Sequence, residues 1–212
     1  MLSDKISPNI TAAILSGGRN KRMNGRNKAF IRIGGAPFIQ KTIKLLKEIF
    51  PETFIVTNSP AEYSAYKKDC RIISDEIKDI GPLGGIHAAL SKTSKEAVFF
   101  VACDMPFLHN GFIRKEIAYF NKSDSDAVVP RITGLIEPLH AIYRKDLKDK
   151  ISDFVKDSGN RSIRNFLATV KVSYWDVEDD ILHRNMFKNL NTEEDLIEAG
   201  GKIHAGKIKD LV

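Results

Sequence analysis

Short apolar runs alternate with longer stretches of helical periodicity along nearly the whole chain, and this alternation constrains the fold more than any other feature. Residues 97–102 read Ala-Val-Phe-Phe-Val-Ala, which is typical of a strand that is buried on both faces. Residues 37–50 instead place apolar side chains at helical spacing and begin with a proline suited to a first helical turn. Such alternating units favour an α/β fold with a mostly parallel sheet.

The other apolar runs and helical patterns complete the expected order of elements. Further strands are predicted at residues 11–15, 54–57, 71–74, 127–130, 139–143 and 171–175, with a short β-like piece at 30–33; the 139–143 strand is the candidate for an antiparallel one. Further helices are predicted at residues 61–68, 84–91, 112–120, 145–157, 162–167 and 192–199. No repeat or linker interrupts the pattern, so residues 1–212 are predicted to form one domain, with a core at about 10–198 and a polar tail at 200–212.

The composition is that of an ordinary globular protein. With 42% hydrophobic residues and 12 Phe among 212 residues, the chain can fill a substantial core, which argues against disorder and a coiled coil. The 33 basic and 27 acidic residues leave a net charge of +6, which suits anionic ligands. Because the basic residues are scattered among acidic ones, we expect no nucleic-acid partner.

Cysteine content and hydropathy indicate a protein of the cytoplasm. Cys70 and Cys103 are too few for a disulfide framework, and no Cys/His cluster has the spacing of a metal site. No apolar run approaches the roughly 20 residues of a membrane span, and residues 1–5 lack the apolar stretch of a signal peptide. We therefore expect a cytoplasmic protein without a membrane partner.

A basic, glycine-rich loop follows the first predicted strand, at residues 15–28. Its glycines allow backbone amides to approach phosphate oxygens closely, and three Arg and two Lys supply positive charge. It is not a Walker loop, because Lys28 stands between Asn27 and Ala29, and it has no G-x-G-x-x-G spacing. The pattern predicts a phosphate-binding loop, with a solvated basic turn as the alternative.

Polar residues also follow three other predicted strands. Asp104 comes after the most apolar strand, where a hard oxygen ligand could hold Mg²⁺ beside substrate phosphates. The alternative is an Asp that forms a turn with the help of Pro106. Asp75 and Asn58 close two earlier strands, and each could bind a base or a ribose or only end its strand.

Three weaker features complete the inventory. Gly-Pro-Leu-Gly-Gly at 81–85 precedes a helix whose amino end would attract an anion, although taken alone it favours a tight turn. The polar segments 160–164 and 189–192 include Arg161, which could grip a phosphate or lie in solvent. His87 and His140 stand among apolar neighbours, which favours buried, hydrogen-bonded histidines over acid–base groups, and Trp175 is expected in the core.

Taken together and in order, these motifs resemble the MobA family of molybdenum cofactor guanylyltransferases. The matching segments are Leu-Ser-Gly-Gly at 15–18 with Arg22, Met23 and Lys28, Gly-Pro-Leu-Gly-Gly at 81–85, Cys-Asp-Met-Pro-Phe at 103–107 and Asn-Leu-Asn-Thr-x-Glu-Asp-Leu at 189–196. Glu-Pro-Leu-His at 137–140 and Asn-Arg-Ser-Ile-Arg at 160–164 are also similar. The resemblance spans about residues 10–198, and the ordered set is far more specific than any one segment.

The resemblance implies a Rossmann-like, three-layer nucleotidyltransferase fold, similar to nucleotide-diphospho-sugar transferases. It implies an enzyme that binds GTP and Mg²⁺, joins GMP to molybdopterin and releases pyrophosphate, with molybdoenzymes or other cofactor-biosynthesis proteins as partners. Carried onto this sequence, it assigns GTP to Leu15, Ser16, Gly17, Gly18, Lys28, Asn58, Asp75, Gly81 and Asp104, catalysis to Arg22, Lys28 and Asp104, Mg²⁺ to Asp104, and molybdopterin to Arg161, Asn189 and Asn191.

Two loop residues depart from the family pattern. Asn24 stands where the family usually has Gly after Arg-Met, and Asn tolerates a positive φ better than most residues. Asn27 replaces the usual Asp before Lys28, which bears on any role that needs a charge there. The alternatives are a related cytidylyltransferase, a sugar-phosphate nucleotidyltransferase, or a non-catalytic protein that binds a nucleotide or pterin; the presence of both Lys28 and Asp104 weighs against the last.

Overall fold

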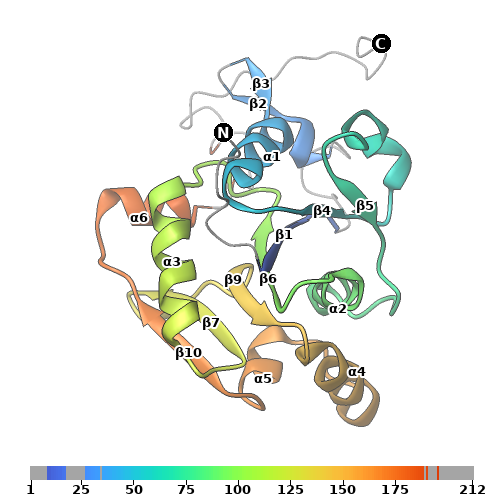
Figure 1. Cartoon of the computed structure of the whole chain (residues 1–212), viewed down its shortest axis with the longest axis vertical. Coiled ribbons are helices and arrows are strands. Elements are labelled where there is room, and N and C mark those ends of the chain that lie inside the picture. The colour runs from blue at the N-terminus through green and yellow to red at the C-terminus, as the bar shows by residue number, and fades with distance from the viewer. Residues whose placement is uncertain (1–8, 18–26, 34, 189, 191–194, 196–212) are drawn as a thin grey trace.

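One mixed sheet runs through the middle of the molecule in the order β10-β7-β9-β6-β1-β4-β5, with β8 paired to β7 outside this order (Figure 1). The structure is a computed structural model, and it describes residues 9–17, 27–33, 35–188, 190 and 195. The sheet strands are β1 (Ile10–Leu15), β4 (Thr53–Val56), β5 (Arg71–Ile73), β6 (Ala97–Ala102), β7 (Ala127–Ile132), β8 (Leu135–Ile136), β9 (His140–Arg144) and β10 (Val172–Asp176). A separate antiparallel pair joins β2 (Arg32–Ile33) to β3 (Ala36–Pro37).

Helices cover both faces of this sheet (Figure 1). The α-helices are α1 (Phe38–Ile49), α2 (Pro82–Lys92), α3 (Asn110–Lys122), α4 (Leu147–Ser158), α5 (Ile163–Leu167) and α6 (Ile181–Met186), and two 3-10 helices are η1 (Lys28–Phe30) and η2 (Pro60–Tyr66). None of the helices in the described part of the chain combines the length and apolar character that crossing a bilayer requires.

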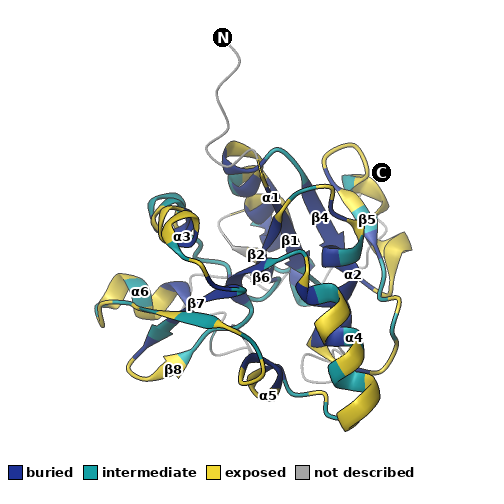
Figure 2. Cartoon of the chain, turned by 60° about the horizontal axis from the view of Figure 1, so that its bottom comes forward, coloured by how far each residue is buried: buried dark blue, intermediate teal, exposed yellow. Residues whose placement is uncertain are grey.

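The core lies on both faces of the central strands, which are buried along their length (Figure 2). Successive side chains of a strand point to opposite faces, so neighbouring residues of β6 serve different helical layers. Phe99 belongs to the buried cluster that includes α1 and α3, whereas Phe100 belongs to the cluster that includes α2, α4 and α5. This arrangement confirms the three-layer α/β fold, and it explains why residues 97–102 are all apolar.

The strand directions bring several strand ends to one edge of the sheet. β1 is parallel to β4 and β6, β4 is parallel to β5, and β10 is parallel to β7. β9 is antiparallel to both β6 and β7, as the sequence suggested for residues 139–143. The carboxyl ends of β1, β4, β5 and β6 therefore lie side by side, and β9 begins at the same edge because His140 pairs with Val101.

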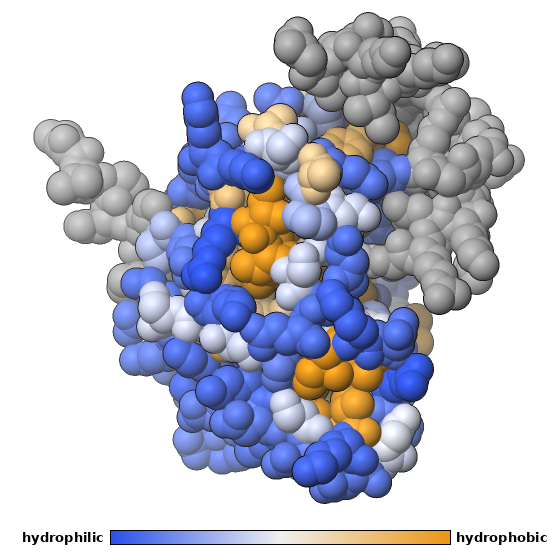
Figure 3. All heavy atoms as spheres, turned by 90° about the vertical axis from the view of Figure 1, so that its right-hand side faces the viewer, coloured by the Kyte–Doolittle hydropathy of each residue, from blue (hydrophilic) through white to orange (hydrophobic). Residues whose placement is uncertain are grey.

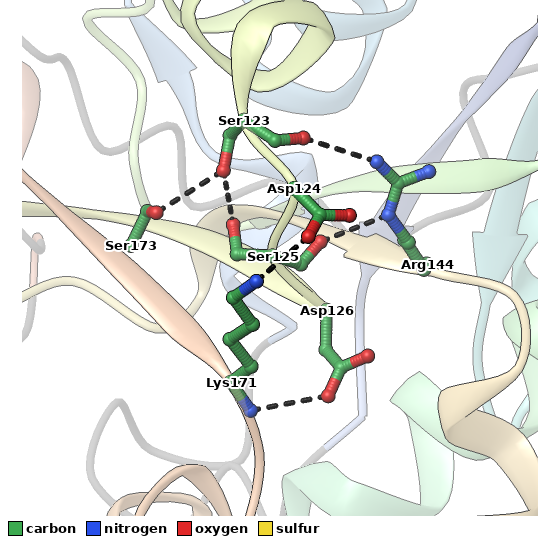
Figure 4. A network of polar contacts seen from close by, with 7 residues as sticks. All are labelled: Ser123, Asp124, Ser125, Asp126, Arg144, Lys171 and Ser173. Carbon is green, nitrogen blue, oxygen red and sulfur yellow. Dashed lines mark hydrogen bonds and ion pairs between the residues drawn. The ribbon is translucent and has the colours of Figure 1, made fainter.

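A polar network closes the opposite edge of the sheet (Figure 4). The Arg144 guanidinium donates to the carbonyl oxygens of Ser125 (2.8 Å) and Ser123 (3.2 Å), just after α3. The backbone N–H of Lys171 donates to the Asp126 carboxylate at 3.1 Å, where β7 and β10 begin. These contacts lie at the other ends of the strands from Asp104, and they hold α3, β7, β9 and β10 together.

The observed elements differ from the predicted ones where local pattern was weak. The helix predicted at residues 61–68 is present as the 3-10 helix η2, which has Tyr63 as its only buried residue and therefore no apolar stripe. β8 and α6 were not predicted, because β8 has two residues and α6 exposes Ile181 and Leu182. Trp175, expected in the core, is half-buried and stacks on Phe112. The helix predicted at 192–199 lies outside the described residues except at 195.

Both histidines that were expected to be buried are buried. The side chain of His87 is hydrogen-bonded to the Ser152 hydroxyl at 3.0 Å, between α2 and α4. His140 is fully buried, and its Nε2 lies 3.3 Å from Oε2 of Glu116, which is also fully buried. Burial raises the pKa of the Glu116 carboxyl, and the neighbouring His140 acts in the opposite direction.

This buried carboxyl makes stability depend on pH. Because the pKa of Glu116 is higher in the folded than in the unfolded chain, the folded state holds its proton to a higher pH, and the free energy of unfolding falls as pH rises between the two pKa values. Glu116→Gln cannot titrate and should lose less stability over this range. Urea unfolding from pH 4 to pH 8, with the exposed Glu178→Gln as control, measures the difference. Parallel curves for wild type and Glu116→Gln would contradict it.

Candidate active site

Four residues expected at a nucleotide lie within two residues of the ends of neighbouring strands. Ser16 comes after β1, Asn58 after β4, Asp75 after β5 and Asp104 after β6. Backbone hydrogen bonds extend the strand pairing into these segments, from the N–H of Ser16 to the carbonyl of Val56 (2.8 Å) and from Cys103 to Leu15 (3.0 Å). The parallel register thus gathers side chains that are far apart in the sequence at one edge, where open α/β sheets bind their ligands.

Lys28 and Asp104 form an ion pair at this edge. Lys28 Nζ lies 3.5 Å from Asp104 Oδ2, and the two side chains are 13% and 24% exposed. Lys28 is the first residue of η1, which begins because the Asn27 side chain accepts a hydrogen bond from the Ala29 N–H at 3.1 Å. The fully buried Ala29 anchors this helix, so the loop lysine is held beside the carboxylate.

Leu190 connects the end of the described chain to the same carboxylate segment. Its backbone N–H donates to the carbonyl oxygen of Asp104 at 3.1 Å. Its side chain is 1% exposed and packs against Phe38 and Phe107. Asn189 and Asn191, which were expected at the pterin, lie outside the described residues, as do Gly18 and Arg22.

Asn58 and Asp75 are linked to each other. The Asn58 amide donates to Asp75 Oδ2 at 2.7 Å, and its oxygen accepts from the Lys78 ammonium at 2.9 Å. Sequence reasoning did not single out Lys78, although it is the basic residue nearest to Asp75 in the sequence. The two predicted residues therefore present a carboxylate and an amide together rather than separately.

The glycines of segment 81–85 have two different uses. Gly81 precedes α2 with a φ of 61°, which L side chains rarely adopt, so the predicted turn is present there. Gly84 and Gly85 lie inside the helix and permit close approach: a Cβ on Gly84 would stand 2.9 Å from the Ile77 carbonyl oxygen and 3.2 Å from the Asp75 carboxylate. The first turn of α2 thereby packs directly against Asp75, where the helix dipole favours a negative charge.

Arg161 lies on the connection between α4 and α5. α4 lies beside α2, where the Ser152 hydroxyl is hydrogen-bonded to His87 at 3.0 Å. Arg161 is exposed. Burial raises the pKa of the Glu137 carboxyl on the neighbouring turn, while His140 and Arg164 lower it.

Tyr63 is a residue of this region that sequence reasoning missed. It is fully buried, and its hydroxyl is hydrogen-bonded both to Ser16 Oγ and to Asn27 Nδ2, the latter at 2.8 Å. Burial raises the pKa of Tyr63 to about 12, against the effect of these two hydrogen bonds. A buried tyrosine hydroxyl needs partners, but local sequence does not show which partners it has.

The model of the MobA-like NTP transferase domain matches residues 12–172. The chain belongs to this family. Its relatives include the molybdenum cofactor guanylyltransferase of Syntrophotalea carbinolica, which is 34% identical over 189 residues, covering 87% of this chain and 88% of that protein. The family that the ordered motifs suggested is thereby confirmed.

Solved structures agree with this MobA-like fold. Molybdopterin-guanine dinucleotide biosynthesis protein A from Archaeoglobus fulgidus superposes with a TM-score of 0.77 at 27% identity, covering 90% of this chain and 96% of that one. CMP:2-keto-3-deoxy-manno-octonic acid synthetase, solved with CTP, superposes with a TM-score of 0.69 at 12% identity, which shows likeness of fold alone. The predicted nucleotidyltransferase architecture with a mostly parallel sheet is confirmed.

The close approach at Gly84 predicts a graded response to alanine. Gly84→Ala should lower the free energy of unfolding by about 1–3 kcal/mol, because its Cβ would meet the Ile77 backbone oxygen, which cannot move without the chain. Gly85→Ala is the matched control on the same helix: its Cβ would stand 2.9 Å from Leu15 Cδ2 and 3.4 Å from Val56 Cγ1, which are side-chain rather than backbone atoms, so the loss should be smaller. Thermal and urea unfolding test the order, and equal losses would contradict it.

Proposed function

We propose that this chain transfers GMP from GTP to molybdopterin, releasing pyrophosphate. The observation that carries the proposal is the Lys28–Asp104 ion pair at the strand edge, because a lysine can bind a phosphate and a carboxylate can bind Mg²⁺ beside it. The similarity to the Syntrophotalea guanylyltransferase and to the Archaeoglobus molybdopterin-guanine dinucleotide biosynthesis protein supports this substrate pair. Cys70 and Cys103 are free thiols, which suits the reducing cytoplasm that we propose as its compartment.

The residues at Asp104 fit a magnesium ion. Its carboxylate is a hard oxygen ligand, and it keeps 24% of its side-chain surface exposed. Within the described part of the chain, no three His, Cys, Asp or Glu side chains form a cage around a metal. Mg²⁺ commonly takes one or two protein carboxylates and completes its shell with substrate phosphates and water, as Asp104 would allow. When bound, the ion would supply charge neutralisation on the phosphate oxygens.

The chain's own residues would then position the reactants. Lys28 would place its positive charge against the triphosphate, and the exposed Gly17 leaves room for phosphate close to the backbone. The Asn58–Asp75 pair offers a carboxylate acceptor for the N–H and O–H donors of guanosine. Arg161, Asn189 and Asn191 remain the proposed pterin residues, as the family resemblance implies.

The reaction needs little covalent chemistry from the protein. A terminal phosphate of the pterin attacks the α-phosphorus of GTP, the bond to the bridging oxygen breaks, and pyrophosphate leaves. A phosphate monoester is already a nucleophile at neutral pH, so the site does not require a strong general base. Positioning and charge neutralisation by Lys28, and by Arg22 where the family resemblance places it, are therefore the chemistry that this site must supply.

Nucleotide selectivity tests the proposal directly. GTP at 100 times its dissociation constant should raise the free energy of unfolding by about 2.7 kcal/mol, measured as a thermal shift with Mg²⁺. CTP, ATP and UTP at the same concentration should stabilise the protein less. A preference for CTP would instead assign a cytidylyltransferase with the same site residues, and no response to any nucleotide would contradict the catalytic proposal.

Asp104→Asn tests the metal carboxylate. The variant should fold normally and lose about 100-fold or more in pyrophosphate release with GTP, molybdopterin and Mg²⁺, because a neutral amide binds Mg²⁺ poorly. Asp153→Asn, an exposed carboxylate on α4, is the matched control and should retain wild-type turnover. Wild-type turnover by Asp104→Asn would remove Asp104 from the mechanism.

A further inference from the structure

The hydroxyl of Tyr63 joins two residues that flank the phosphate loop, and the mechanism above uses neither Tyr63 nor the Asn27 side chain. Ser16 follows β1 and Asn27 begins η1, and both are hydrogen-bonded to the same buried oxygen. The Tyr63 ring itself is held in place, because it is 0% exposed and packs against Phe30 with ring centroids 5.0 Å apart. The donor and the acceptor of each hydrogen bond between Asn27, Tyr63 and Ser16 follow from the atoms present.

The orientation of the Asn27 amide is settled by its backbone partner. The Ala29 N–H can only donate, so the atom 3.1 Å from it is the amide oxygen. The amide nitrogen then faces Glu62 Oε2 at 2.7 Å and the Tyr63 oxygen at 2.8 Å. A carboxylate only accepts, which agrees with this orientation. Both hydrogens of the Asn27 amide are therefore used, one of them on Tyr63.

This orientation sets the direction of the next hydrogen bond. Because Tyr63 accepts from Asn27, its single hydrogen is free for Ser16 Oγ, and a buried hydroxyl hydrogen without an acceptor would be costly. Ser16 Oγ thus accepts from Tyr63, and its own hydrogen points elsewhere. The Cys103 thiol is within reach of Ser16, but sulfur is a weak acceptor compared with a phosphate oxygen.

We propose that Asn27 and Tyr63 are positioning residues that make Ser16 a hydrogen-bond donor toward a phosphate oxygen of the nucleotide. Phosphate oxygens only accept, so the relay presents the group that an anion needs, beside the cation of Lys28. Ser16 is half-buried at the carboxyl end of β1, where a donated hydrogen can reach a ligand. The inference rests on the proposed function only in taking a nucleoside triphosphate as the ligand.

The direction of the relay can be reversed without changing net charge. In the double variant Asn27→Asp/Glu62→Gln, the new carboxylate at position 27 still accepts from Ala29 and now accepts from Tyr63 as well. The new amide at position 62 takes over the donation between these two side chains. Tyr63 would then donate to the carboxylate at position 27 and accept from Ser16, so the donated hydrogen of Ser16 would no longer be available to the phosphate.

Binding to the full chain tests this reversal. Dissociation constants for GTP and for inorganic triphosphate, each with Mg²⁺, are measured by calorimetry for wild type, the reversed double variant and Tyr63→Phe. The reversed variant should weaken binding of both probes about tenfold, the effect of one hydrogen bond to a charged group. Tyr63→Phe leaves the Ser16 hydrogen free but no longer oriented, so it should weaken binding less. The control is Tyr66→Phe on the same 3-10 helix. The Tyr66 hydroxyl forms no hydrogen bond with a described residue, so this variant should bind both probes as the wild type does. Thermal unfolding of each variant verifies that it folds.

Repeating the reversal in a Ser16→Ala variant distinguishes an effect of the relay from an effect of the carboxylate that moves from position 62 to position 27. If the relay acts through Ser16, adding the reversed pair to Ser16→Ala should cause no further loss, whereas a further tenfold loss would overturn the proposal. Equal affinities of the wild type and the reversed variant for GTP would also overturn the relay, while the proposed transfer of GMP from GTP would stand. If the wild type prefers CTP and the reversed variant binds inorganic triphosphate more weakly, the proposed guanine specificity would be overturned and the relay supported.

Discussion

The parallel pairing of β1 with both β4 and β6 is the constraint on which the rest of this structure depends. Leu15 is level with Val56 on one side and with Ala102 on the other, so three strands end together. The residues that follow them come from distant parts of the sequence and meet only because of this register. The first turn of α2 and the short helix that carries Lys28 are placed against the same edge, so the site follows from the sheet.

The order and type of the long elements could be predicted because each has a clear period. The all-apolar run of β6 and the stripe of α1 are patterns that burial on two faces or on one face requires. The antiparallel direction of β9 was also suggested by the sequence. The elements that were not predicted are short ones. β8 is too short to have a period, and α6 leaves Ile181 and Leu182 exposed, so both elements depend on tertiary packing. The face of the molecule on the β5 side is largely hydrophilic with separate apolar patches (Figure 3). Because apolar side chains also occur on the surface, an apolar residue by itself does not predict a helix or a strand.

For the site, sequence showed the residues that follow strands but not the side chains that hold them. Asp104 and Asp75 could be named from type and position alone. Tyr63 could not, because its partner Ser16 is 47 residues away and is reached only when η2 packs beside β1. Gly84 and Gly85 lie in a helix, as predicted for residues 84–91, but sequence did not show that they allow the backbone to approach Asp75. Contacts of this kind depend on the complete fold.

Two features distinguish this edge from the rest of the molecule. Glycine lowers intrinsic helix stability by about 1 kcal/mol relative to alanine, yet α2 has two, because at Gly84 the Ile77 carbonyl and the Asp75 carboxylate leave no room for a Cβ. Lys28 and Asp104 lose much of their hydration at 13% and 24% exposure, whereas Lys171 and Asp124 at the other edge pair while exposed to solvent. The glycines therefore follow from the packing of α2 against the end of β5, whereas a sheet does not need a partly buried ion pair. The Lys28–Asp104 pair is the feature of this edge that the proposed ligand binding would account for.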